Sequence, residues 1–299
     1  MAPFTWHTPV TSWAMPIPAA VVLAVATLGY LWLAHRRSPW PRARTAWFLA
    51  GIVVTALAMG GGVNAYAGVL FSMHMIQHLL LIMVAPAFFV LAQPLRLLGA
   101  DGRALRVATH PAAAFVLYTA VVVGTHLTPF QQSAVTQHWL HGLEEVLYLV
   151  SGYLLLVPVL GEDGVRRPPS HLLRLTILLA GMMVDTIVGL TLLLTSHNPF
   201  PAYGATVRDW GPGLLDDLHQ GGAIMWVGGD VLMAALAIVV ITRWVNSPGG
   251  GNDLGPWLEA ARRSAVGGGL DSGVDIDDDE EALRAYNAML SRLEGRDRT

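Results

Sequence analysis

Seven runs of mostly apolar residues recur along the chain, each close to the ~20 residues that a helix needs to cross a hydrocarbon core of ~30 Å. Their bounds lie near residues 15–34, 46–63, 69–92, 111–127, 142–160, 172–195 and 220–243. Runs of this length with so few charges are typical of transmembrane helices. The pattern predicts an all-α, polytopic membrane protein built as a bundle of seven transmembrane helices.

The composition agrees with lipid as the surrounding solvent. Hydrophobic residues make up 54% of the chain and charged residues only 13%, with a mean hydropathy of +0.50. A soluble domain lacks the polar surface to cover so much apolar material. The 18 basic residues, all Arg, face 21 acidic ones, which excludes a basic surface for nucleic acid. Cysteine is absent, so a bound metal would need His, Met, Asp or Glu as ligands.

Arginine is concentrated on one side of the predicted membrane. The first, third and fifth connections, the segment after the last run and the ends of the runs beside them hold every Arg except Arg208. Because cytoplasmic connections carry an excess of basic residues, this pattern places the amino terminus outside and the carboxyl terminus in the cytoplasm. The chain is therefore expected to be a multi-pass protein of the cytoplasmic membrane.

Two prolines and the end of the chain depart from the apolar pattern. Pro86 in the third run and Pro158 near the end of the fifth are expected to bend their helices. After residue 246 the sequence becomes rich in glycine and then in acidic residues, which is typical of a flexible segment. We predict a transmembrane domain of residues 1–246 and an acidic cytoplasmic tail of residues 247–299. Apolar residues at helical spacing near the end of the tail indicate a short helix, either docked or solvated.

The third run contains two histidines four residues apart, in the segment FSMHMIQHLLL. His74 and His78 lie on one face of a helix, and polar groups at that depth face the interior of a bundle. Met73 and Met75 flank His74, and thioether with imidazole is a ligand set suited to Cu(I). Two interpretations stay open: a copper site, or hydrogen bonds between neighbouring helices.

Further polar residues gather on the same side of the predicted membrane. His141 and Glu145 share a helical face in HWLHGLEEVLYL, and His126 ends the fourth run. Asp217 and His219 precede the last run in LLDDLHQGG, where two glycines permit close approach of helices. Each residue alone is typical of the membrane interface. Their coincidence predicts a site facing outward.

Three ionisable residues lie deeper in their runs. At 1.5 Å per residue, His78, Asp185 and Asp230 each lie roughly 15 Å from the outer end of a run. Intramembrane carboxylates usually mark a pathway or a paired site. The alternative is a hydrogen-bonded packing contact, for example with Thr186.

Four segments carry longer motifs: FSMHMIQHLLLIMVAPAFFVLAQPLRLL, HPAAAFVLYTAVVVGTHLTPF, QHWLHGLEEVLYLVSGYLLLVPVL and DLHQGGAIMWVGGD. In combination they resemble the third, fourth, fifth and seventh spans of the CtaG family of caa3-type cytochrome c oxidase assembly factors. The likeness extends from about Val69 to Trp244. It implies a seven-helix chaperone that helps to build a heme-copper oxidase of the respiratory chain. The implied partners are oxidase subunits or other assembly factors, and nucleic acid is not among them. The resemblance implies that the chain has no catalytic activity.

The resemblance also implies which residues carry the function. The polar residues of the family correspond here to His74, His78, His126, His141 and Asp217. Glu145 stands where a second histidine is expected one turn after His141. This difference argues against a site of imidazoles alone and in favour of one with both imidazole and carboxylate ligands. In some related proteins such a region is fused to a CopD-like copper-uptake module. Copper transport therefore stays an alternative function for this chain.

We therefore predict that His74, His78 and His141 converge and bind copper. The groups expected to complete or buffer the site are His126 or His219, together with Met75 or Glu145. One alternative is a copper transporter, in which Asp185 and Asp230 continue the site into the membrane. Another is a b-type heme protein with two histidines as axial ligands.

Overall fold

The computed structural model describes residues 3, 5, 7–37, 39–161, 163, 169–206, 208–247 and 280–296. These residues form helices and their connections, and no strand occurs among them. Contacts divide the chain into two units. The first comprises Met1–Pro169 with Leu173–Val240, and the second comprises Ser170–Leu172 with Ile241–Thr299.

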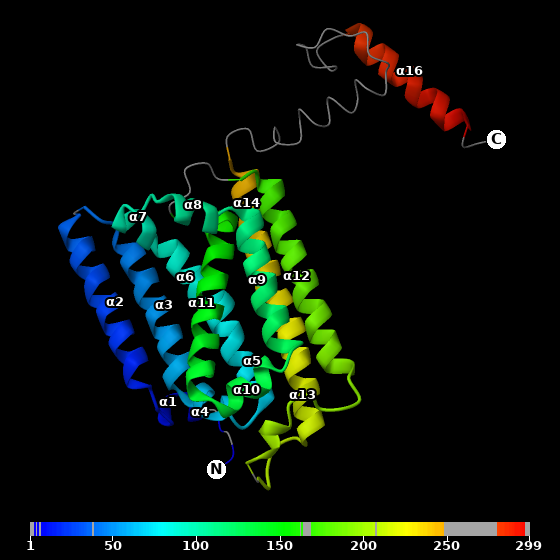
Figure 1. Cartoon of the computed structure of the whole chain (residues 1–299). Coiled ribbons are helices and arrows are strands. Elements are labelled where there is room, and N and C mark those ends of the chain that lie inside the picture. The colour runs from blue at the N-terminus through cyan, green and yellow to red at the C-terminus, as the bar shows by residue number, and fades with distance from the viewer. Residues whose placement is uncertain are drawn as a thin grey trace. The chain divides into compact units, whose positions relative to one another are not determined.

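The first unit is a bundle of long helices (Figure 1). In the described part of the chain, 6 helices are long and apolar enough to cross a membrane, and up to 7 if the bent pair α9 and α10 is one span. The spans are α2 (Ile17–Arg36), α3 with α4 (Arg42–Gly60 and Gly62–Ala67), α5 to α6 (Phe71–Ala92), α9 with α10 (Pro111–His126 and Phe130–Thr136), α11 (His138–Leu160), α12 (His171–Leu194) and α13 to α14 (Leu214–Val245). The predicted all-α membrane bundle is confirmed.

Short helices lie at both ends of the bundle. α7 (Pro94–Leu98) and α8 (Arg103–Ala108) lie at one end, and α1 (Thr8–Thr11), α4, α10 and α13 lie at the other (Figure 1). We refer to the second end as the α10 end. Another short element is η2 (Pro201–Gly204), a 3₁₀ turn that contacts α10.

The fourth span differs from a straight helix. α9 has 16 residues, about 24 Å at 1.5 Å per residue, which is less than a hydrocarbon core of ~30 Å. The chain then turns by 69° into α10. α9 ends ahead of Pro129, whose ring disfavours helical geometry in the preceding residue. The turn brings α10 against α11 and η2.

The third span changes its helical form before Pro86. α5 (Phe71–Leu79) passes into a π-helical turn, η1 (Leu80–Val84), before α6 (Ala85–Ala92) begins. Pro86 has no N–H to donate to the carbonyl of Ile82, and a wider turn accommodates its ring. The irregularity expected at Pro86 is therefore a π-helical turn, whereas α11 continues through Pro158 to Leu160 as one helix.

Glycines set the closest approaches between spans. Gly152 of α11 lies against Ile82, where a Cβ atom would overlap the carbonyl oxygen. Gly222 of α13 crosses Gly189 of α12, and a Cβ on Gly222 would lie 2.7 Å from the carbonyl oxygen of Gly189. The close helix approach predicted for the glycine pair near the start of the last span is confirmed.

The buried carboxylate of Asp217 fixes the start of α5. It accepts hydrogen bonds from the backbone N–H groups of Phe71 (2.7 Å) and Ser72 (3.3 Å) and from the Ser72 hydroxyl (2.5 Å). The first N–H groups of a helix have no partner within the helix, and an acidic group there is favourable. Asp217 thereby connects α13 to the helix that carries His74 and His78.

The second unit contains the ends of two spans and one further helix. Within it the ring of His171 stacks on the ring of Trp244, with centroids 6.0 Å apart. Residues Glu280–Arg296 form α16. The predicted boundary at residue 247 and the acidic part of the tail lie largely outside the described residues and stay predictions.

The orientation in the membrane is open to a direct test, because the chain has no cysteine of its own. We expect Thr136→Cys in α10 to react with a membrane-impermeant maleimide added to intact cells. Ala104→Cys in α8 should react only after the cells are opened. Both positions are exposed, so they differ in the side of the membrane rather than in burial. The reverse labelling pattern would invert the predicted topology.

Candidate metal centre

α5 presents a row of buried side chains to the interior of the bundle. His74 and His78 are four residues apart and therefore one turn apart on the same face. Their ring centroids are 4.4 Å apart and the rings are nearly perpendicular. Only 1% of His74 and 4% of His78 is exposed. The helical spacing seen in the sequence thus produces a buried pair of imidazoles.

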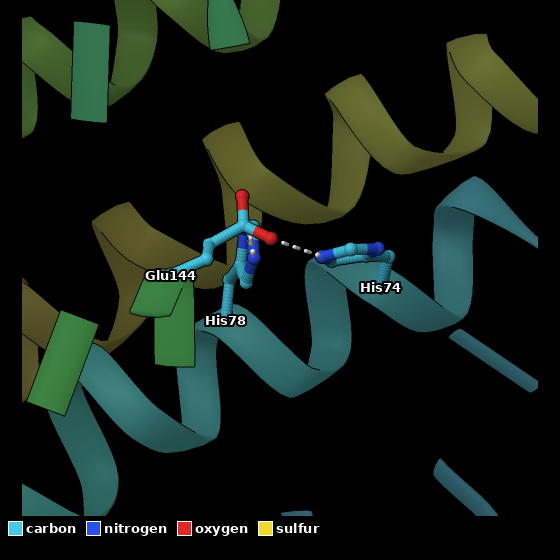
Figure 2. A group of neighbouring side chains, drawn as sticks. All are labelled: His74, His78 and Glu144. Atoms are coloured by element: carbon cyan, nitrogen blue, oxygen red, sulfur yellow. Dashed lines mark hydrogen bonds and ion pairs between the residues drawn. The ribbon is translucent and has the colours of Figure 1, made fainter. Parts of the chain in front are cut away.

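Glu144 of α11 contacts both histidines (Figure 2). Its Oε2 atom is 3.2 Å from His74 Nε2, and its Oε1 atom is 3.6 Å from His78 Nε2. The carboxylate is completely buried. One ligand atom from each of the three residues lies within 4.8 Å of the others, which is the spacing of a metal site.

His141 joins the group from the first turn of α11. Its Nδ1 atom is 3.5 Å from Glu144 Oε2, and its Nε2 atom is 3.6 Å from Glu145 Oε1. The rings of His141 and His74 have centroids 5.1 Å apart. Glu145 also accepts a hydrogen bond of 2.8 Å from Gln77 Nε2. The structure therefore brings His74, His78 and His141 together around Glu144, with Glu145 at the edge of the group.

Two side chains from connecting segments cover the centre at the α10 end. Tyr203 of η2 places its hydroxyl 2.7 Å from His74 Nδ1. Gln131 of α10 places its Nε2 atom 3.2 Å from His74 Nδ1 and donates to the Tyr203 hydroxyl at 3.0 Å. Burial raises the pKa of Tyr203 well above its ordinary value, so its hydroxyl stays protonated. A neutral hydroxyl of this kind orients the His74 ring, as supporting partners do for metal ligands.

A second group of contacts lies deeper, on the far side of His78. His126 at the end of α9 places its Nε2 atom 3.4 Å from His78 Nδ1 and 3.2 Å from Met75 Sδ. The ring of Tyr148 stacks on His78 with centroids 3.9 Å apart. The Tyr148 hydroxyl lies 2.7 Å from Thr125 Oγ1. His126 and Met75 are thus beside the centre, but they contact His78 rather than Glu144.

His74 Nε2 and Glu144 Oε2 lie within hydrogen-bond distance of each other, at 3.2 Å, but a second pair of atoms in the centre has no such bond. His78 Nε2 and Glu144 Oε1 are both buried without a hydrogen-bond partner, although they face each other at 3.6 Å. An unpaired polar atom in an apolar interior costs free energy. Around a tetrahedral ion with ligand distances of about 2.1 Å, neighbouring ligand atoms are about 3.4 Å apart. The observed separations of 3.2 and 3.6 Å fit a bound cation.

A large cavity reaches the centre from the side. Its volume is ≈ 740 Å³, and side chains of α2, α3, α4, α10 and α11 line it. The polar part of the wall includes His74, His141, Glu145, Asn64 and His138, whereas most of the remaining wall is apolar. Because Gln131 and Tyr203 cover His74 from the α10 end, this cavity is the open approach to the centre.

The structure does not bring the other predicted residues to this group. His219 Nε2 lies 2.9 Å from the carbonyl oxygen of Thr195, beyond the end of α12. Asp185 accepts hydrogen bonds of 2.8 and 2.9 Å from the Tyr118 hydroxyl. Asp230 accepts one of 3.1 Å from Thr186, the packing contact that the sequence left open. The predicted polar residues thus form two groups. One group makes up the candidate metal centre, and the other forms hydrogen bonds elsewhere in the bundle.

Sequence reasoning missed four residues of the centre and its surroundings: Glu144, Gln131, Tyr203 and Tyr148. Glu144 had a usable signal, because it lies three residues after His141 and therefore also one turn away. Gln131 and Tyr203 follow breaks in the chain, where no periodic pattern predicts the direction of a side chain. Nothing in the sequence distinguishes Tyr148 from an ordinary aromatic residue of a transmembrane helix.

Comparison with known proteins agrees with this architecture. The family model described as cytochrome c oxidase caa3 assembly factor matches residues 13–247. Uncharacterized proteins of Mycobacterium bovis and Mycobacterium tuberculosis are each 30% identical to the chain, over 92% of this chain and 43% of their own length. A protein of Mycobacterium leprae is 27% identical with the same shares.

The chain therefore spans less than half the length of these curated relatives. No solved structure matches the chain. The family model covers both helices of the centre, α5 and α11, and most of the residues of the bundle. On this evidence the chain belongs to the Caa3_CtaG family of cytochrome c oxidase caa3 assembly factors.

Proposed function

We propose that the chain binds copper during the assembly of cytochrome c oxidase and exchanges it with a partner in the membrane. The ligands are His74, His78, Glu144 and His141. The observation that carries the proposal is the facing pair of unpaired buried atoms, His78 Nε2 and Glu144 Oε1, with His74 Nε2 beside them. A cation between these atoms satisfies the two unpaired atoms and takes the place of the hydrogen bond between His74 Nε2 and Glu144 Oε2.

The charge of the centre also favours a cation. Glu144 is buried, and its ionic contacts in the described part of the chain are with the three histidines His74, His78 and His141. Neutral imidazoles leave the carboxylate uncompensated, which is costly in a low-dielectric interior. A bound metal ion supplies the missing positive charge and uses the imidazoles in their neutral form.

The ligands and the family both support copper as the metal. Imidazole and carboxylate hold copper or zinc, but the thioether of Met75 lies in the next layer, 3.2 Å from His126. Thioethers select copper(I) over zinc. Since the family assembles a heme-copper oxidase, copper is the cargo that fits both the site and the process. A role in binding and exchange needs no catalytic group.

The proposal predicts a joint loss of copper and of oxidase. Purified full-length His74→Ala and His78→Ala are expected to bind at least about tenfold less copper(I) than the unmodified chain, because each removes a ligand. In a strain that depends on this chain, the same variants should lower oxidase activity. Copper per chain is measured by elemental analysis, and activity by oxidation of reduced cytochrome c in membranes.

Two histidines outside the centre serve as controls. His219→Ala removes a bond to the Thr195 carbonyl, and His171→Ala removes a stacking contact with Trp244. Both should retain copper and oxidase activity. Full copper binding by His74→Ala and His78→Ala would contradict the centre. Copper uptake into vesicles by a chain that is dispensable for oxidase assembly would identify a transporter instead.

A further inference from the structure

Three imidazoles line the large cavity that leads to the centre. His138 is the first residue of α11, at the α10 end of the bundle (Figure 1), and His141 follows it by three residues. His74 of α5 lines the same cavity. His138 is exposed, whereas 22% of the His141 side chain and 1% of the His74 side chain is exposed. The three rings therefore form a row that leads from the surface of the chain to the centre.

The steps between these rings are short. His138 and His141 are three residues apart in one helix, so their Cβ atoms are about 5–6 Å apart. The ring centroids of His141 and His74 are 5.1 Å apart. His141 Nδ1 also lies 3.5 Å from Glu144 Oε2, so the second ring of the row already contacts the centre. A copper ion bound to one ring of the row therefore needs only a movement of side chains to reach the next.

The charge of the cavity wall favours a cation. Glu145 lines the cavity and places its Oε1 atom 3.6 Å from His141 Nε2. Among the described residues that line the cavity there is no Arg. A cleft that holds a carboxylate and no basic residue attracts cations and repels anions. The wall thus suits the passage of a copper ion from the first ring of the row to the centre.

Two glycines keep the cavity open. Gly68 and Gly142 both line it, and a Cβ atom added at either position would meet no neighbouring atom within 4 Å. The φ angle of Gly68 is −79°, a value open to any L residue. A larger side chain at Gly68 can therefore extend into the cavity without a clash at its Cβ atom. Such a side chain narrows the route and leaves the ligands of the centre in place.

We propose that His138 is the entry ligand of the chain, which takes copper(I) from a donor at the mouth of the cavity and passes it to His141 and the centre. Release follows the same route in reverse. The copper ion stays copper(I) throughout. At each step the lone pair of a neutral imidazole replaces a donor atom that leaves, so the transfer needs no oxidant and no reductant. This proposal rests on the proposed function.

The test measures how fast copper(I) is removed from the loaded chain. Purified full-length protein carrying copper(I) is mixed, without oxygen, with an excess of a coloured copper(I) chelator, and the growth of colour gives the rate. Equilibrium competition with the same chelator gives the affinity. His138→Ala should slow removal by at least about tenfold and leave the affinity unchanged, because His138 binds copper only during the transfer. Since the affinity is the ratio of the loading and release rates, loading must slow by the same factor.

Further variants separate a ligand from a structural role. His138→Met replaces one ligand of copper(I) by another and should restore most of the rate. Gly68→Leu fills part of the cavity and should slow removal at unchanged affinity. The matched controls lie outside the cavity wall: His197→Ala changes another exposed histidine, and Gly29→Leu changes another glycine with open space around its Cβ position. Both controls should keep the rate of the unmodified chain.

Removal at the unmodified rate from His138→Ala or from Gly68→Leu overturns the entry route and leaves the centre at Glu144 standing. A lower affinity of His138→Ala also overturns it, because His138 would then be a ligand of the centre itself. If His138→Met stays as slow as His138→Ala, the role of His138 as a ligand is wrong. Failure of the unmodified chain to bind copper(I) at all overturns the proposed function as well.

Discussion

Glu144→Gln should abolish most of the stabilisation that copper gives to the chain. Ligand at 100 times its dissociation constant stabilises a folded protein by about 2.7 kcal/mol, which corresponds to a rise in melting temperature of roughly 5–10 °C for a domain of 150–250 residues. Glutamine keeps the shape of the side chain but removes the charge that faces His74 and His78. We expect an affinity loss of at least about 100-fold, and therefore almost no copper-dependent rise.

The neighbouring carboxylate provides the matched control. Glu145 accepts a hydrogen bond from Gln77 and contacts only His141 among the three histidines. Glu145→Gln should therefore keep most of the copper-dependent rise. Melting of purified protein in detergent, with and without copper(I), measures both variants. Equal responses of the two variants would show that Glu144 has no special role and that the metal lies elsewhere.

Much of the fold follows from patterns that a single span carries by itself. Hydrocarbon thickness fixes the length of each apolar run, so every predicted span overlaps a helix of the structure. The i, i+4 spacing of His74 and His78 is likewise a property of one helix and predicts their shared face. Departures arise where a local chemical detail intervenes, as with Pro86 and the π-helical turn before it.

The candidate site was less predictable, because it depends on how each helix is rotated about its own axis. Depth along a run placed His219 near His141, but the rotation of α13 directs His219 to the Thr195 carbonyl. Glu144 and Glu145 both follow His141 by about one turn, and only the packing of α11 against η1 and α6 of the third span decides that Glu144 faces His74. The spacing of residues in the sequence does not determine how a helix is rotated about its axis.

A close contact between α11 and the third span lies at Gly152, two turns along α11 from Glu144. Gly152→Ala should destabilise the bundle, because the new Cβ atom would overlap the carbonyl oxygen of Ile82 in η1. This oxygen cannot move aside as the end of a flexible side chain can. Overpacking of this kind costs typically 1–3 kcal/mol and occasionally more, and we expect the upper end of that range. The melting temperature in detergent should fall by about 6–12 °C.

Gly142→Ala on the same helix separates this clash from the general effect of replacing glycine. No atom lies within 4 Å of a Cβ atom at Gly142, and alanine in a helix is favoured over glycine by about 0.5–1 kcal/mol. Gly142→Ala should therefore leave the melting temperature unchanged or raise it slightly. Gly152→Ala should also weaken copper binding, since α11 must move away from η1 in the third span and carry Glu144 away from His78. A Gly152→Ala variant with unchanged melting temperature and unchanged copper affinity would refute this account of how α11 is positioned.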